Sequence, residues 1–287
     1  MSNNVYEVEK RDANHSRDMN RLVKRMKEMA PSSYAPDLFL VQEARKKSVR
    51  RIRDLMTERF DCTFSIAANA SRGAWQWIKK YWKLSGQDTA VIMNNDSVFL
   101  RSRGHISHPY SRSKAARGDL VKVKKSAWAE VREINQPDQN RRPMTVVAAS
   151  VHFPRGSDFR TERKNRRLKK KFSVRLARAL ERKQAEGGRY DEVIHVIAGD
   201  FNMNRYKGWP GNPMPPFRAL TSPPWNYVDG PTLRATRGNP NPIDFLFSTG
   251  KPLKARMDAS NNRHVGSKHF YSNHDLRWSL LSAYSRS

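Results

Sequence analysis

The stretch Val193-Ile194-His195-Val196-Ile197-Ala198-Gly199-Asp200-Phe201-Asn202 decides the fold that we expect for this chain. A run of Val and Ile that ends in turn residues is typical of a strand buried on both faces. Residues two apart on a strand share a face, so Asp200 and Asn202 can point into the same space beyond the strand's end. A Gly-Asp pair also makes ordinary turns. However, a carboxylate leaving a buried strand is costly unless it is paired or binds a metal ion, which makes Asp200 a candidate site residue.

Other apolar strands carry polar side chains at or near their ends. These strands are residues 38–41 with Glu43, 144–151 with His152, 242–247 with Asp244, and 271–281 with Asn273 and His274. Apolar residues at helical spacing predict helices over 16–29, 45–59 and 160–183. The alternation of helices and strands indicates strand layers covered by helices.

The remaining segments give weaker signals. Residues 90–93 and 97–100 read as a hairpin that turns through 94–96, and further strands are expected at 120–123 and 127–131. The stretches 208–242 and 254–269 are expected to be loops. The aromatic and lysine side chains of 75–82 can stack on bases or lie at a membrane interface, although their helical spacing favours a core position. No repeat or composition break divides the chain, so we expect a single domain over residues 1–287.

Charge is the strongest compositional signal. The chain carries 55 Lys and Arg against 27 Asp and Glu, a net charge of +28. Such a surface attracts polyanions, so nucleic acid is the expected partner; a generally basic surface and anionic lipid headgroups are the alternatives. Helix 160–183 is the most basic element, with twelve Lys or Arg and two Glu. A solvated helix face is the ordinary interpretation, and contact with a phosphate backbone is the functional one.

The sequence also bears on compartment. The single cysteine, Cys62, excludes an intrachain disulfide framework and fits a reducing compartment. The first residues lack an apolar signal region, and no window approaches twenty consecutive apolar residues, as a transmembrane helix would need. We therefore expect a cytoplasmic protein without a transmembrane segment.

The strand-end side chains suit a hard cation. They are Asn4, Glu43, His152, Asp200, Asn202, Asp244 and His274. Mg²⁺ prefers a few carboxylates together with water and phosphate oxygens, whereas zinc is disfavoured because no local His or Cys pairing occurs. An imidazole beside a carboxylate can act as a general base on water.

The order of these motifs resembles that of the endonuclease/exonuclease/phosphatase superfamily. This superfamily includes DNase I-like nucleases, abasic-site endonucleases, neutral sphingomyelinases and inositol polyphosphate 5-phosphatases. The motifs are Leu40-Val41-Gln42-Glu43, Ser150-Val151-His152-Phe153-Pro154, Gly199-Asp200-Phe201-Asn202, Ile243-Asp244-Phe245 and Ser272-Asn273-His274. The resemblance covers nearly the whole chain. It implies an α/β fold, the four-layered α/β/β/α sandwich of two mixed β-sheets flanked by helices that DNase I-like proteins share, with the site at the top of the sandwich.

The resemblance also implies roles for individual residues. Glu43 is similar to the metal-binding glutamate, with Asn4 and Asn273 as further ligands of Mg²⁺, or of Mn²⁺ in its place. The implied catalytic residues are His152 on the phosphate, Asp200 and Asn202 on the attacking water and the phosphate, and Asp244 orienting His274. We expect substrate phosphates to contact Arg155, Lys169 and Lys170.

The sequence departs from the family pattern at two places. The last motif is usually Ser-Asp-His, but here Asn273 replaces the acid, so a charge is lost and Mg²⁺ affinity is expected to fall. Asp275 cannot simply replace it, because adjacent strand residues face opposite sides. If Asn4 ends the first strand, that strand has almost no residues.

These observations favour a Mg²⁺-dependent phosphodiesterase, a nuclease that hydrolyses DNA or RNA by in-line attack of an activated water. One alternative is a phospholipid or inositol phosphate phosphoesterase, in which residues 75–82 contact the membrane. Another is a catalytically weakened nucleic-acid-binding protein, suggested by Asn273 and the short first strand. A purely structural role would leave the converging strand-end polar groups unexplained.

Overall fold

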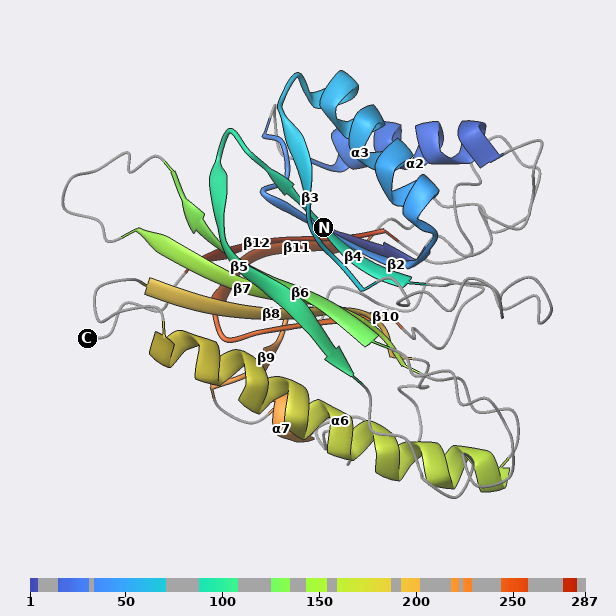
Figure 1. Cartoon of the computed structure of the whole chain (residues 1–287), viewed down its shortest axis with the longest axis vertical. Coiled ribbons are helices and arrows are strands. Elements are labelled where there is room, and N and C mark those ends of the chain that lie inside the picture. Colours follow the sequence, from blue (N-terminus) through green and yellow to red (C-terminus); the bar gives the residue numbers. More distant parts are fainter. Residues whose placement is uncertain are drawn as a thin grey trace.

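The chain folds into two six-stranded β-sheets that pack face to face, with helices covering the outer face of each (Figure 1). This arrangement is seen in a computed structural model. It describes residues 1–4, 15–30, 34–70, 88–107, 125–134, 143–153, 159–186, 192–201, 218–221, 224–228, 244–257 and 276–282. The predicted α/β/β/α sandwich is therefore confirmed.

The first sheet has the strand order β11-β12-β1-β2-β4-β3. Its strands are β1 (Ser2–Asn4), β2 (Leu38–Ala44), β3 (Phe64–Asn69), β4 (Asp88–Asn94), β11 (Lys251–Met257) and β12 (Arg277–Ser282). Two helices cover it, α2 (His15–Met29) and α3 (Lys46–Phe60). Their bounds agree to within one residue with the helices predicted over 16–29 and 45–59.

The second sheet has the order β5-β6-β7-β8-β10-β9. Its strands are β5 (Val98–Ser107), β6 (Lys125–Glu133), β7 (Met144–His152), β8 (Glu192–Asp200), β9 (Asn226–Tyr227) and β10 (Asp244–Ser248). The long helix α6 (Phe159–Glu186) and the short helix α7 (Arg218–Thr221) lie on its outer face. None of the helices in the described part of the chain is long and apolar enough to span a membrane.

Each sheet is built around one parallel pair of strands joined through a helix. In the first sheet β1 and β2 are parallel and α2 connects them, and in the second sheet β7 and β8 are parallel and α6 connects them. The other neighbouring strands pair antiparallel. The two parallel pairs face each other, because β2 contacts both β7 and β8 and β1 contacts β8.

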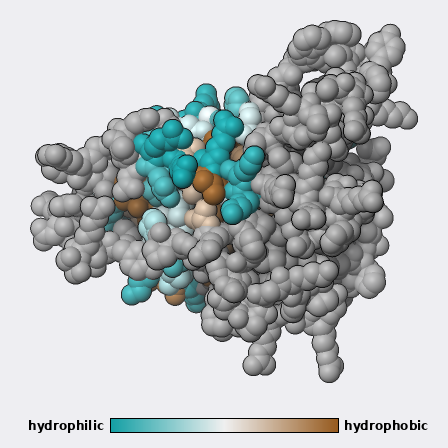
Figure 2. Space-filling view, turned by 90° about the horizontal axis from the view of Figure 1, so that it is seen from below, coloured by the Kyte–Doolittle hydropathy of each residue, from teal (hydrophilic) through white to brown (hydrophobic). Residues whose placement is uncertain are grey.

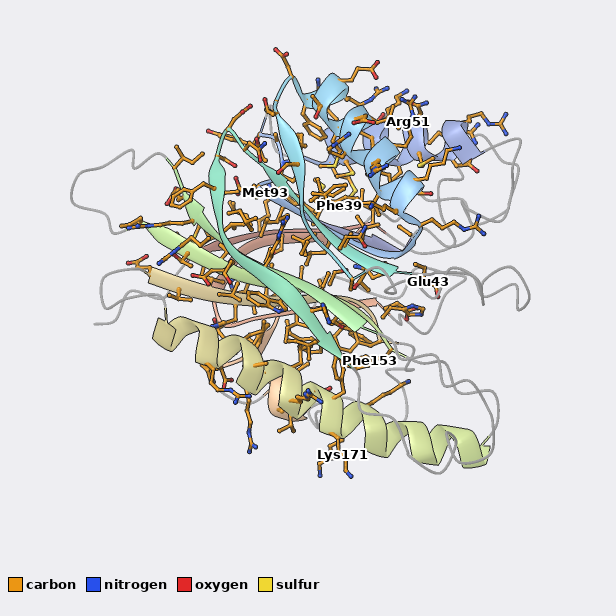
Figure 3. The ribbon with its side chains drawn as sticks, in the orientation of Figure 1. Phe39, Glu43, Arg51, Met93, Phe153 and Lys171 are labelled. Carbon is orange, nitrogen blue, oxygen red and sulfur yellow. The ribbon has the colours of Figure 1, made fainter. Side chains whose placement is uncertain are left out.

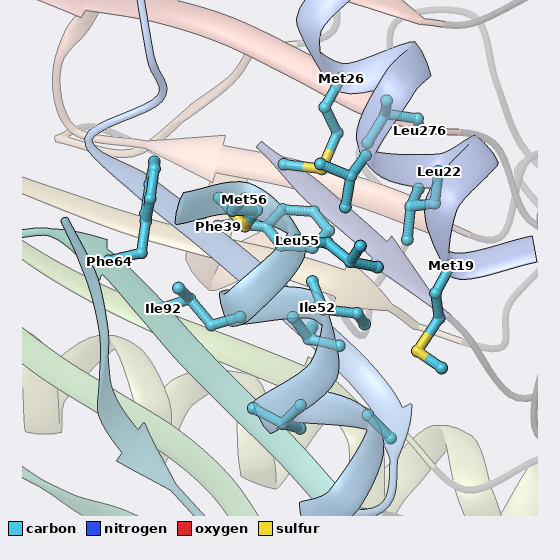
Figure 4. Close-up of a cluster of buried hydrophobic side chains, with 14 of the residues drawn as sticks. Met19, Leu22, Met26, Phe39, Ile52, Leu55, Met56, Phe64, Ile92 and Leu276 are labelled. Atoms are coloured by element: carbon cyan, nitrogen blue, oxygen red, sulfur yellow. The ribbon is translucent and has the colours of Figure 1, made fainter. Parts of the chain in front are cut away.

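Three apolar layers hold these elements together. One lies between the first sheet and helices α2 and α3, where side chains such as Met26 and Leu55 pack against Phe39 and Ile92 (Figure 4). A second lies between the second sheet and α6. The third fills the space between the sheets and is rich in alanine, whose small side chain lets the two sheets approach each other closely. Strands β7 and β8 contribute to the last two layers, as expected for strands buried on both faces.

The predicted hairpin at 90–93 and 97–100 is wrong in its pairing. The turn itself exists: the Asn94 side-chain oxygen accepts a hydrogen bond from the Asp96 backbone nitrogen at 3.0 Å. However, β4 belongs to the first sheet and β5 to the second. The turn residues reverse the chain direction, but they do not determine which sheet the next strand joins.

The predicted loop at 254–269 is also wrong at its start, because residues up to Met257 belong to β11, which pairs antiparallel with β12. β11 is an edge strand with Lys251, Pro252 and Lys254, a composition that protects edges from further pairing and hides the strand from pattern analysis. The first strand, β1, is as short as predicted, with three residues. The segments 75–82 and 120–123 lie outside the described residues.

Candidate active site

Three predicted site residues meet where strands of both sheets end. Glu43 lies near the end of β2, and His152 and Asp200 are the last residues of β7 and β8. The His152 Nε2 is 2.8 Å from Glu43 Oε1 and 3.7 Å from Asp200 Oδ2. Their exposed fractions are only 9%, 5% and 3% for Glu43, His152 and Asp200. The carboxyl ends of the facing parallel strands thus form one compact polar cluster.

A backbone distortion turns Glu43 toward this cluster. Glu43 has a positive φ of 56°, which is rare for a residue with a side chain. The pairing of β2 with β4 shifts register between Val41 and Ala44, the mark of a β-bulge. Bulges redirect side chains and are common beside active sites. The strained residue is therefore the one whose carboxylate reaches His152.

A buried hydrogen-bond bridge joins the two sheets beside the cluster. Gln42 Nε2 donates to Leu40 O and to Ser150 Oγ, both at 2.9 Å, and Ser150 Oγ donates to Val41 O at 2.7 Å. Gln42 and Ser150 are both fully buried. Gln42 precedes Glu43 in β2, and Ser150 is two residues before His152 in β7. The bridge thus fixes the strand carrying Glu43 relative to the strand carrying His152.

The end of β8 requires glycine before Asp200. Gly199 has φ +146°, and a Cβ there would lie 2.1 Å from Val151 O and 3.0 Å from Gln42 Cγ. Since real Cβ atoms do not approach a carbonyl oxygen so closely, only glycine fits between β7 and the Gln42 side chain. The close contact brings Asp200 beside His152, its partner in the parallel register.

Aromatic side chains support the cluster from the α6 side. The Phe153 nitrogen donates to Asp200 O at 2.8 Å. The Phe153 ring packs edge-on against Phe172 of α6 and Phe201, with centroids 5.1 and 4.8 Å apart. All three rings are buried. The residues after His152 and Asp200 are therefore held by packing, which limits movement of the two ligand strands.

The cluster has the chemistry of a divalent metal site. One potential ligand atom from each of Glu43, His152 and Asp200 lies within 4.8 Å of the others. Two carboxylates this close repel each other unless a proton or cation lies between them. The three side chains could hold a divalent cation, and the bulge and the glycine bring them together.

The backbone places two more predicted residues beside the cluster. Asn4 pairs in register with Gln42, next to Glu43 in the chain, and Asp244 pairs in register with Asp200. Their side chains lie outside the described part of the structure. Asn202, Asn273, His274 and Arg155 lie outside it entirely.

The two lysines predicted to contact substrate differ in their surroundings. Lys170 is exposed on α6, but Lys169 is 3% exposed and has an interaction partner. The turn of the helix carries Lys169 to the side of the apolar residues, where Phe172 and Leu176 are buried. Contact of either lysine with substrate stays a prediction.

Sequence reasoning missed the supporting residues Gln42, Ser150 and Gly199. A signal was present: Gln42 and Ser150 are polar residues within strands that are otherwise apolar. Such residues are buried only when they are hydrogen-bonded, so each indicates a specific partner. The partner itself is more than a hundred residues away and cannot be read from local sequence.

The architecture matches solved structures over nearly the whole chain. An endonuclease/exonuclease/phosphatase from Bacteroides vulgatus has a TM-score of 0.67 at 13% identity, covering 99% of this chain and 97% of that one. A family protein from Leptotrichia buccalis has a TM-score of 0.57 at 11% identity, with 98% of both chains covered. The chain has the fold of the endonuclease/exonuclease/phosphatase family. A humanized D. rerio TDP2 shares it, with a TM-score of 0.55 at 14% identity, covering 98% and 97% of the two chains.

No protein-family model and no curated protein matches the sequence. The similarity to endonuclease/exonuclease/phosphatase proteins is therefore one of fold. The resemblance predicted from five short motifs is confirmed at that level, since strands far apart in sequence bring three of those motifs together.

Proposed function

We propose that this chain is a metal-dependent phosphodiesterase that hydrolyses nucleic acid by in-line attack of water. The observation that carries the proposal is the cluster of Glu43, His152 and Asp200, which joins the ends of strands from both sheets. Buried carboxylates beside an imidazole are costly to assemble unless they are paired or bind a cation, so the cluster is a candidate functional site. The fold shared with endonuclease/exonuclease/phosphatase proteins supports the same reaction class.

Each residue of the cluster has a distinct role in this proposal. Asp200 orients the attacking water and accepts its proton. His152 contacts the phosphate and supplies a proton to the leaving oxygen, while the Glu43 carboxylate, 2.8 Å from the His152 Nε2, fixes the ring. Asn202, Asp244 and His274 complete the catalytic set as predicted from the motifs.

Glu43 and Asp200 would hold a Mg²⁺ or Mn²⁺ ion, with Asn4 and Asn273 as the further ligands implied by the motifs. When bound, such an ion supplies positive charge that stabilises the transition state of phosphoryl transfer. Nucleic acid is the proposed substrate because the net charge of +28 favours a polyanion.

The test is cleavage of plasmid DNA and of structured RNA by the purified protein, with Mg²⁺ or with EDTA. We expect cleavage with Mg²⁺ only. Asp200→Asn should lower the rate at least about a hundredfold, the usual size of a general-base contribution. A matched control is Glu192→Gln, which changes an acid to its amide at the other end of β8 and should leave the rate unchanged.

Cleavage that survives Asp200→Asn would contradict the proposal, because it would come from another site or a contaminant. If the folded wild type cleaves neither polymer, the nuclease activity is refuted, and phospholipid and inositol phosphate substrates are then tested. Failure on these as well would favour a nucleic-acid-binding protein with a weakened site, for which Asn273→Asp is the restoring substitution.

A further inference from the structure

The outer face of α6 carries a straight row of cations. Lys171, Arg175, Arg178 and Arg182 are all exposed and are spaced four, three and four residues apart. This spacing places them on one face of a helix. The apolar side chains of α6 are buried on the opposite side, against the second sheet. Lys171 points away from the sheets in Figure 3, whereas Glu43 lies at the end of the sandwich.

These cations have no acidic partners among the described residues. In α2, by contrast, Arg25 pairs with Glu28 at 2.9 Å and Arg21 with Asp18 at 3.3 Å. The acid on the described face of α6, Glu181, accepts a hydrogen bond from the buried Trp225 Nε1 at 2.8 Å instead. Like charges one turn apart repel, so the row destabilises an isolated helix and is stabilised by an anionic partner.

The row has the dimensions of a nucleic-acid backbone. The eleven residue-to-residue steps from Lys171 to Arg182 span about 16 Å, since an α-helix rises about 1.5 Å per residue. Phosphates along one strand of duplex DNA are about 3.4 Å apart along the axis, so the row extends over roughly five of them. Arg is also the side chain best suited to bind phosphate through two hydrogen bonds.

A membrane fits this surface less well. A helix that lies on a membrane inserts an apolar face beside its basic one. In α6 the residues Phe172, Leu176 and Leu180 are buried in the protein, and no large exposed apolar residue of the described part of the chain lies on this helix. Viewed from the α6 side, most of the described residues at the surface are hydrophilic, with a few apolar ones between them (Figure 2).

We infer that this row, the α6 cation row, is a second binding surface, separate from the catalytic cluster. It binds the phosphate backbone of a long nucleic acid at a distance from the bond that is cleaved. The inference rests on the proposed function for the identity of the polyanion. Its consequence is that affinity depends on length: a duplex that reaches both surfaces binds more tightly than one that covers a single surface.

The test replaces the row with Lys171→Gln/Arg175→Gln/Arg178→Gln/Arg182→Gln, because Gln keeps nearly the same helix propensity as Lys and Arg. Binding is measured in EDTA, so that no cleavage occurs, with long duplex DNA, long duplex RNA and a duplex of about ten base pairs, one helical turn. We expect roughly tenfold or greater loss of affinity for the long duplexes. The slope of log affinity against log salt should fall by roughly three to four on DNA. Binding of the short duplex should change less.

The matched control removes four exposed cations that are scattered over other elements: Arg17→Gln/Arg51→Gln/Lys251→Gln/Lys254→Gln. It lowers the net charge equally. Equal losses in both variants would overturn the inference, because general charge alone would then explain binding. Vesicles of phosphatidylserine and phosphatidylcholine are a further probe, and binding to vesicles but not to duplexes that depends on the row would also overturn it.

Failure of this binding surface can be distinguished from failure of the proposed catalytic function. A wild type that cleaves no nucleic acid but binds long duplexes through the row would refute the catalysis and support the surface. Cleavage and binding that do not depend on the row would support the catalysis and refute the surface.

Discussion

His195 is a buried imidazole that the proposed chemistry does not use. It is 2% exposed, in the middle of β8, with Nδ1 3.3 Å from Thr249 Oγ1 and no hydrogen-bond partner for Nε2 among the described residues. Burial lowers the pKa of His195 to about 4, against the opposing effect of the Glu181 carboxylate. The neutral imidazole is therefore the form that the fold accommodates.

This residue should make the protein sensitive to acid. Because its folded pKa is below the unfolded value of about 6.5, the folded state binds fewer protons. The free energy of unfolding is therefore highest above about pH 6.5, where His195 is neutral in both states. It falls by roughly 3 kcal/mol at most as the pH drops toward 4. Urea unfolding at several pH values should show that His195→Asn reduces the loss of stability between pH 6.5 and 4. An unchanged pH dependence in this variant would show that other groups cause it.

Single residues of the site were predictable where each one ends a buried strand. Glu43, His152 and Asp200 follow apolar runs, and a charge in that position needs a partner. The positive φ of Glu43 was not predictable, because it arises from a bulge that forms only when β2 pairs with β4. Gly199 was visible as a turn residue, but its role depends on the close approach of Val151 O.

Among the elements, the bridge from β2 to β7 controls how the two sheets meet at the site. Gln42→Leu leaves Ser150 Oγ with one partner fewer in a fully buried position, so we expect a loss of about 1–3 kcal/mol in unfolding free energy. Ser150→Ala should cost a similar amount. The double variant should cost less than the sum, because both ends of the bond are then apolar.

If the bridge positions Glu43, its loss should also change metal binding at the site, which loss of stability alone would not do. Glu43 should move relative to His152 in Gln42→Leu, so the concentration of Mg²⁺ needed for half-maximal cleavage should rise, even at temperatures where the variant is fully folded. Thr89→Val is a control, since Thr89 makes a different bond between the sheets, to the Ala127 nitrogen at 2.8 Å. Equal changes in both variants would show that the site responds to general loosening of the sandwich.

Helices and central strands were predictable because hydrophobic periodicity marks elements with one buried face or two. The edge strand β11 was not, since its Lys and Pro residues are selected by exposure at an edge rather than by burial. Similarly, local turn chemistry around Asn94 predicted a reversal of the chain but not the change of sheet between β4 and β5. Sheet assignment depends on contacts between distant segments, which local patterns do not contain.

At the scale of the whole molecule, the candidate metal ligands belong to both sheets. Glu43 comes from the first sheet, and His152 and Asp200 come from the second. In the unfolded chain these side chains are far apart, so an ion that they share binds the folded state preferentially. Binding should therefore stabilise the complete sandwich and not a single element.

Mg²⁺ should accordingly raise the melting temperature. An ion present at a hundred times its dissociation constant adds about 2.7 kcal/mol, which corresponds to several degrees for a chain of this size. Glu43→Gln removes the charge of one candidate ligand and should abolish most of the shift, whereas Glu192→Gln, at the opposite end of β8, should keep it. Thermal unfolding over a range of Mg²⁺ concentrations, with Na⁺ at matched ionic strength, measures the effect without requiring catalysis. A shift that is equal in Glu43→Gln and the wild type would place the ion elsewhere on the protein. The motif resemblance implies an acid at position 273, where this chain has Asn273. If position 273 contributes a ligand, Asn273→Asp should reach the same shift at a lower Mg²⁺ concentration.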